Sequence, residues 1–220
     1  MRFARALWLL LLLAAPLAAQ ARKPAKPADP DKPVKGGGSL PAGWSARTDD
    51  DGKEADVKFV TMDKGYHVTL GPATILWRAA DKVDGTFHAV ALFTQTRPTQ
   101  HAEGYGLFVG GHDLGGGGEK YTYFLIRQDG TFLIKKRDGG ATSNITSNWT
   151  AHPAILRPNA AGQSTNRLEV TVGRDRLAFA VNGKEVYTAD PRLIDAKGIV
   201  GLRVNHNLDL HIDGFGVQKQ

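Results

Sequence analysis

The stretch that decides the fold is Glu103–Gly130, which reads EGYGLFVGGHDLGGGGEKYTYFLIRQDG. It holds a short apolar run, a loop from Gly110 to Gly118 in which six of nine positions are glycine, and a second, longer apolar run. Short runs that are rich in β-branched and aromatic residues and end at glycine indicate β-strands. The stretch therefore predicts a strand, a mobile loop and a second strand.

The same pattern continues outward from this stretch in both directions. The expected strands are 57–61, 66–70, 73–78, 86–96, 105–109, 121–127, 132–136, 166–172, 176–181, 184–188, 199–204 and 208–217. Asn182-Gly183 suits a two-residue turn that needs positive φ at both positions. An irregular stretch remains at 139–165, and a helical turn is expected near 191–195. Many short strands without a sizeable helix predict an all-β, antiparallel sandwich or barrel.

Residues 1–21 have the features of a secretory signal peptide. Two arginines precede an apolar run that is too short to span a bilayer, and Ala19-Gln20-Ala21 supplies small residues for cleavage. Residues 22–41 are rich in proline, lysine and glycine, which is typical of a linker. We therefore expect a secreted or periplasmic protein with one folded domain at 42–220 and no transmembrane segment after cleavage. An uncleaved N-terminal anchor is the alternative.

The charge of the chain argues against a nucleic-acid partner. Of the formal net charge of +6, the signal peptide carries +2, and the linker, with five basic and two acidic groups, carries +3. The folded domain is left with +1, whereas a nucleic-acid-binding domain needs its charge on the domain itself. The basic linker is either a contact for an anionic envelope surface or a spacer. Because the chain has no cysteine, disulfides and a lipid-modified cysteine are excluded.

Alternation along 121–127 assigns side chains to the two faces of a sheet. Tyr121, Tyr123 and Arg127 share one face, and the residues between them form a dry row. Aromatic rings can cover the apolar faces of sugars, and a guanidinium supplies forked donors for hydroxyls. The row is a candidate carbohydrate-binding face. The alternative is that both tyrosines are core residues with their hydroxyls at the rim.

Metal and nucleophile chemistry have little support in the sequence. None of the five serines lies in a G-x-S-x-G elbow, and the seven histidines are scattered without an H-E-x-x-H pattern. Asp209, His211 and Asp213 share one strand face, where alternate residues can meet a metal, and aspartate is a good calcium ligand, although such a row is more often a solvated face. No cofactor is expected. The glycine loop leads into a strand rather than a helix, which excludes a phosphate cradle.

Glycoside hydrolysis requires two carboxylates that face one bond. The sequence has five glutamates and lacks the E-x-D-x-x-E strand of sandwich-fold endoglucanases. Glu103 and Asp113 are the weak candidates for catalysis. His112 in the glycine loop and Trp149 in the irregular stretch are further candidate ligand-binding residues.

Several segments carry a resemblance to a known superfamily. They are YGLFVGGHDL at 105–114, YTYFLIRQDGTFLIKKR at 121–137, LAFAVNGKEVY at 177–187, GIVGLRV at 198–204 and IDGFGV at 212–217. In this order they resemble the concanavalin A-like lectin/glucanase superfamily, in particular secreted bacterial domains related to the 3-keto-disaccharide hydrolase group. The resemblance covers about residues 43–217. It implies a jelly-roll sandwich of two sheets and a carbohydrate-related role, but it transfers no catalytic residue.

Three functions remain open at this point. The first is a secreted or periplasmic carbohydrate-binding sandwich that uses the aromatic and arginine face. The second is a glycoside hydrolase acting on a modified (3-keto) disaccharide, and the third is a non-catalytic envelope interaction module. A cleft that holds Glu103, Asp113 and Arg127 with the carboxylates ~5–10 Å apart would favour the enzyme.

Overall fold

The computed structural model describes residues 37, 39–49 and 53–220, so the predicted signal peptide and most of the predicted linker lie outside the described residues. The strands are β1 (Trp44–Thr48), β2 (Val57–Met62), β3 (Gly65–Leu70), β4 (Thr74–Val83), β5 (Phe87–Gln95), β6 (Gly104–His112), β7 (Lys120–Arg127), β8 (Thr131–Asp138), β9 (Ala141–Asn144), β10 (Thr150–Ala151), β11 (Ser164–Val172), β12 (Leu177–Val181), β13 (Lys184–Ala189), β14 (Gly198–Val204) and β15 (Asp209–Lys219). Two 3₁₀ helices, η1 (Glu54–Asp56) and η2 (Pro191–Leu193), accompany them. In the part of the chain that the structure describes, no helix has the length and apolar character to cross a membrane.

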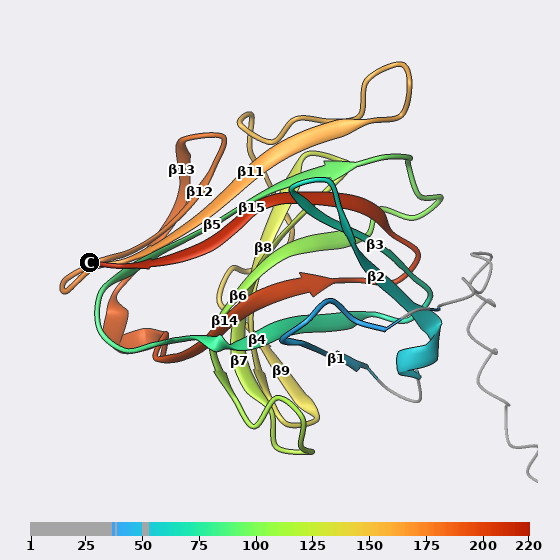
Figure 1. Ribbon diagram of the computed structural model, residues 1–220. Helices are drawn as coiled ribbons and strands as arrows, with labels where there is room; N and C mark the ends of the chain where they lie inside the picture. Colours follow the sequence, from blue (N-terminus) through green and yellow to red (C-terminus); the bar gives the residue numbers. More distant parts are fainter. Residues whose placement is uncertain (1–36, 38, 50–52) are drawn as a thin grey trace, which may run out of the picture. The chain divides into compact units, whose positions relative to one another are not determined.

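The strands form two antiparallel sheets that lie face to face (Figure 1). Sheet A has the order β1-β4-β14-β6-β7-β8-β10, with β9 also paired to β8. Sheet B has the order β13-β12-β11-β5-β15-β3-β2. The predicted all-β, two-sheet antiparallel sandwich is confirmed.

The core lies between the sheets and follows the alternation of the strands. Along β5 every second residue is buried, from Phe87 to Gln95, and β11 shows the same pattern. The inward residues of β6 and β7 join this core, among them Leu107, Phe124 and Ile126. Because each of these side chains is almost completely excluded from water, their burial supplies the main stabilisation of the domain.

The glycine-rich connection is shorter than the sequence predicts. β6 continues through Gly110 and Gly111 to His112, with an irregularity in its pairing to β7, and the prediction that the loop starts at Gly110 is wrong. Gly110 has a φ of +68°, and a Cβ atom there would lie 2.0 Å from the carbonyl oxygen of Asp195. Only glycine permits this close backbone approach, so the glycine serves a bulge inside a strand.

All twelve expected strands are present, and the described residues form three further strands that the sequence did not predict. β1 was not expected, and β9 and β10 lie within the stretch that was expected to be irregular. The helical turn expected near 191–195 is confirmed as η2, which the side chain of Asp190 caps by accepting from the backbone N–H of Arg192. The Asn182-Gly183 turn is also confirmed, with φ values of +51° and +72°.

Candidate functional site

The outer face of sheet A, which is the face turned away from sheet B, carries a second apolar cluster. Its buried members are Ile75, Phe108, Leu114, Tyr121, Tyr123 and Leu125, with Trp77, Trp149 and Ile199 packed against them. The alternate residues of β7 belong to the core between the sheets, so the row of Tyr121, Tyr123 and Arg127 faces away from that core. This is the face that the alternation in the sequence assigns to these side chains.

One row of this face crosses five strands. The backbone register places Trp77 opposite Gly201, Gly201 opposite Phe108, and Phe108 opposite Tyr123. A Cβ atom at Gly201 would lie 2.5 Å from the ring of Phe108, so the ring uses the space that the glycine leaves. On the far side of Tyr123 the register continues to Lys135 of β8. The row is an aromatic strip that ends at a lysine.

The tyrosines form the floor of this face. Only 3% of Tyr121 and 8% of Tyr123 is exposed, and their rings lie 5.7 Å apart between centroids. Burial raises the pKa of both phenols, which therefore stay neutral and keep their O–H donors. The sequence left two alternatives for the tyrosines, a binding face or the core. They lie on the outer face of sheet A, as the first requires, but they are buried, as the second requires.

A buried arginine lies beside these phenols. Arg203 of β14 donates two hydrogen bonds to the carboxylate of Asp49, at 2.8 Å and 2.6 Å. The same guanidinium lies 3.4 Å from the hydroxyl of Tyr121 and 5.8 Å from the ring centroid of Tyr123. Burial opposes the charge on Asp49, but the hydrogen bonds and charge of Arg203 outweigh burial and lower the pKa of this carboxyl. The pair is therefore ionised and holds the floor together.

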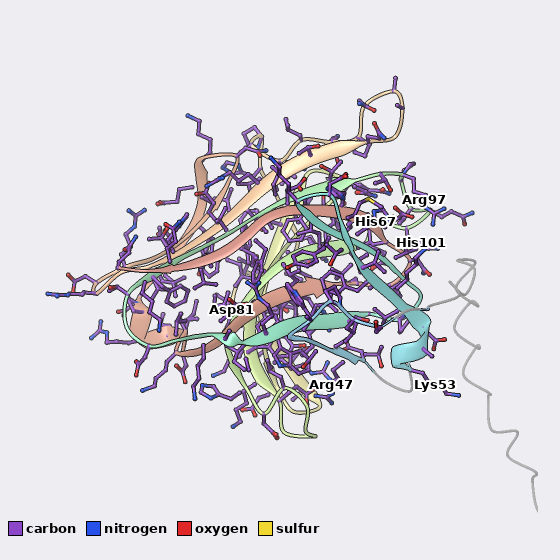
Figure 2. The ribbon with its side chains drawn as sticks, in the orientation of Figure 1. Arg47, Lys53, His67, Asp81, Arg97 and His101 are labelled. Carbon is purple, nitrogen blue, oxygen red and sulfur yellow. The ribbon has the colours of Figure 1, made fainter. Side chains whose placement is uncertain are left out.

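A second set of charges continues this network toward the edge of sheet A. Glu119 is buried, and its carboxylate lies 2.5 Å from Arg47 of β1 and 3.0 Å from Arg137 of β8. Burial would raise the pKa of Glu119, but Arg47 and Arg137 lower it. Arg137 also lies 3.7 Å from Asp49, which joins the two sets. Arg47 is labelled in Figure 2, on the edge strand β1.

At the other end of the face, an aromatic ring and a guanidinium are stacked. The guanidinium carbon of Arg127 lies 4.3 Å from the ring centroid of Trp149. Arg127 is held in place by a hydrogen bond of 2.9 Å to Thr131 and an ion pair of 2.7 Å with Asp129. Trp149 is partly exposed, so the ring remains accessible beside the buried network.

Gly104 provides the space for Trp149. A Cβ atom at Gly104 would lie 2.9 Å from the Cη2 atom of Trp149 and 3.0 Å from the Cδ1 atom of Leu125. The backbone register pairs Gly104 with Arg127. The glycine therefore lets the indole approach the sheet beside its arginine partner.

The candidate residues at the two ends of β6 do not converge. Glu103 precedes the first residue of β6, and its carboxylate lies 3.1 Å from the Nδ1 atom of His206. Asp113 follows the last residue of the same strand, so the backbones of the two residues lie up to roughly 30 Å apart at about 3.3 Å per residue. This separation is far beyond the ~5–10 Å that carboxylates of a glycosidase require.

The side chains of His112 and Asp113, at the turn after β6, contact nearby backbone groups. Asp113 has a φ of +49° and accepts a hydrogen bond of 3.2 Å from the backbone N–H of Gly118. His112 is exposed, and its Nε2 atom lies 2.7 Å from the carbonyl oxygen of Lys197. The structure therefore places His112 and Asp113 apart from the stack of Trp149 and Arg127.

The polar row on β15 lies on the outer face of sheet B. The Nε2 atom of His67 lies 3.2 Å from Asp209, and the Nε2 atom of His211 lies 3.2 Å from Asp213. Figure 2 labels His67 and Arg97, and Arg97 lies 3.5 Å from Asp209. Within the described ranges, no group of three or more His, Cys, Asp or Glu side chains could hold a metal ion.

Sequence reasoning missed much of the charged network. Arg203 left one signal, an arginine between apolar residues in the GIVGLRV run, which marks a charge that needs a buried partner. Asp49 left none, because it belongs to a run of three aspartates. Arg47 lies on β1, Arg137 on β8 and Glu119 just before β7, so only the strand order of sheet A brings them together.

Comparison with solved structures identifies the type of fold. No protein-family model matches the chain, and no curated protein matches it either. Carbohydrate binding module CBM66 from Bacillus subtilis is similar at a TM-score of 0.59 and 13% identity, covering 80% of this chain and 96% of that one.

Two further solved structures have the same fold. A Bacillus subtilis protein of unknown function with a galectin-like fold has a TM-score of 0.56 and 13% identity, covering 80% and 89% of the two chains. The metal-free carbohydrate recognition domain of Emp46p has a TM-score of 0.55 and 12% identity, covering 80% and 88%. The chain therefore has a lectin-like β-sandwich fold.

Proposed function

We propose that the protein binds carbohydrate on the outer face of sheet A. The observation that carries this proposal is the stack of Arg127 on Trp149, 4.3 Å apart, beside a floor of neutral tyrosines and fixed charges. The accessible part of the indole covers the C–H face of a sugar ring, and the guanidinium donates to its hydroxyls. Because neighbouring groups already hold both side chains, little conformational entropy is lost on binding.

The fold supports the same proposal. Two of the similar solved structures are, by their own descriptions, a carbohydrate binding module and a carbohydrate recognition domain. Fold alone does not establish function. The argument therefore depends on the residues of this chain, and the fold makes a sugar the first ligand class to test.

The geometry does not favour a hydrolase that uses Glu103 together with Asp113. The two carboxylates lie at opposite ends of β6 and cannot face one glycosidic bond. We accordingly propose that the protein binds carbohydrate and does not hydrolyse a modified disaccharide. We also propose that binding takes place outside the cytoplasm, in agreement with the N-terminal sequence pattern, and cell fractionation tests this location.

Binding is tested with the purified protein on a panel of neutral and oxidised oligosaccharides, followed by calorimetry on each hit. Trp149→Ala is expected to weaken binding about tenfold, which corresponds to about 1.4 kcal/mol. Tyr187→Ala, a partly buried aromatic residue on β13 of sheet B, is the matched control and should leave the affinity unchanged. Thermal unfolding of each variant separates a lost contact from a lost fold. A flat response of the wild-type protein across the panel would contradict the proposal and favour an interaction module.

A further inference from the structure

A groove adjoins the edge of sheet A next to the stack of Trp149 and Arg127. It has a volume of about 550 Å³ and is lined by Gly130, Ala151, His152, Pro153, Ile155, Leu156 and Arg157. Gly130 belongs to the turn between β7 and β8, and the remaining lining residues belong to β10 and the segment that follows it. Neither the floor of tyrosines nor the charged network contributes to this lining.

The groove is continuous with the proposed carbohydrate face. Trp149 directly precedes β10, and Ala151 is the last residue of that strand, so the ring and the lining of the groove lie close together along the chain. Ala151 pairs with Thr131, whose hydroxyl accepts the hydrogen bond from Arg127 at 2.9 Å. A chain of sugars that covers Trp149 and extends past Ala151 therefore enters the groove.

Two side chains of the groove, Arg157 and His152, can donate hydrogen bonds to a ligand. A Cβ atom at Gly130 would lie 2.8 Å from the Nε atom of Arg157, so this arginine lies across the glycine. Arg157 is exposed and forms no ion pair with any residue that the structure describes. The Nδ1 atom of His152 accepts a hydrogen bond of 3.2 Å from the backbone N–H of Ala154, so the Nε2 atom is the ring nitrogen that can donate to a ligand.

The rest of the lining is apolar. Ile155 is buried, whereas Leu156 is 55% exposed, and Pro153 adds a rigid wall. No aspartate or glutamate is among the described residues that line the groove. A cation without a carboxylate partner, beside an apolar wall, complements a ring that carries a negative charge.

We propose that this groove is a subsite for an acidic sugar, so that the protein selects a glycan with a carboxylate or sulfate group at the unit next to the one on Trp149. Arg157 binds the anionic group, and Leu156 and Pro153 contact the apolar side of the ring. The inference rests on the proposed function, because the groove receives the chain from the outer face of sheet A.

The test compares three ligands with the same backbone: a uronic-acid oligosaccharide, its carboxyl-reduced neutral counterpart and a sulfated derivative. The wild-type protein is expected to bind the better acidic ligand about tenfold more tightly than the neutral one, the size of a charge-assisted hydrogen bond. The comparison of carboxylate with sulfate identifies the anionic group. The preference should shrink as salt is raised, because salt screens exposed charges.

The variants assign the preference to the groove. Arg157→Gln should bind the acidic and neutral ligands equally while its affinity for the neutral ligand is unchanged, and Arg157→Lys should keep part of the preference. Arg174→Gln removes an exposed arginine from the turn between β11 and β12 and should behave as the wild type. A preference that survives in Arg157→Gln, or a wild type that binds acidic and neutral ligands equally, overturns this inference and leaves the proposed function standing. If the wild type binds no glycan at all, the proposed function fails first.

Discussion

The guanidinium of Arg203 and the carboxylate of Asp49 form a two-pronged ion pair between residues 154 positions apart in the sequence. Only 7% of the arginine side chain is exposed, compared with 22% of the aspartate side chain. If one partner is removed, water can therefore solvate the remaining aspartate better than it can solvate the remaining arginine. This asymmetry has a measurable consequence for stability.

Asp49→Ala is expected to destabilise the protein more than Arg203→Met. The first change leaves a buried guanidinium without its main partner and should cost about 3 kcal/mol. The second change leaves a carboxylate that water and Arg137 still reach, and methionine fills part of the space, so its cost should be about half as large. Urea unfolding measures both, and the double variant should lose less than the sum of the two single losses. The opposite order would show that Asp49 is the partner that depends more on the pair.

Stability should decline when the pH falls below about 4. Burial alone would raise the pKa values of Asp49 and Glu119, but their arginine partners lower both below the values of the unfolded chain. Groups with a depressed folded-state pKa stabilise the protein above their unfolded pKa, and they lose this contribution as the pH falls through the folded pKa. The unfolding free energy from pH 7 to pH 3 tests this. Asp49→Asn should flatten the curve, and an unchanged slope would contradict the assignment.

The side chain of the turn residue Asn182 should add to the stability of the protein, beyond the effect of its left-handed backbone conformation. Its side chain donates to the carbonyl of Ala154 at 2.7 Å and accepts from the backbone N–H of Arg167 at 2.8 Å. Asn182→Ala is therefore expected to cost about 2 kcal/mol in urea unfolding. Asp63 has the same φ of +51° in an exposed turn and is the matched control. Asp63→Ala should cost clearly less, and equal costs would mean that backbone strain dominates at both turns.

The sequence predicted the strands that carry an alternating or continuous apolar pattern and missed those that do not. β5 and β7 each bury a full row of side chains, and both were expected. β9 is exposed at all four positions, so it buries nothing that a hydrophobic pattern could reveal. β1 buries little beyond Trp44 and obtains its position from pairing with β4.

The residues of the candidate site likewise fall into those that a local pattern predicts and those that it does not. Tyr121, Tyr123 and Arg127 could be assigned to one face because they lie on one strand, and the alternation of that strand is local information. Trp149 was a candidate only because it is a tryptophan in an irregular stretch, and its stacking on Arg127 depends on the fold. The pairing of Arg203 with Asp49 depends on the order β1-β4-β14 in sheet A, which no local pattern encodes.

Gly104→Ala is expected to weaken glycan binding without unfolding the protein. The added methyl group would lie 2.9 Å from the indole of Trp149, so the ring must move away from Arg127. We expect a several-fold loss of affinity, a change in tryptophan fluorescence, and a cost of about 1 kcal/mol in urea unfolding from local overpacking. Gly140→Ala is the matched control, because a Cβ atom at Gly140 meets nothing within 4 Å. If Gly104→Ala shifts the fluorescence and leaves the affinity intact, the position of Trp149 does not matter for binding, and the site must lie elsewhere on sheet A.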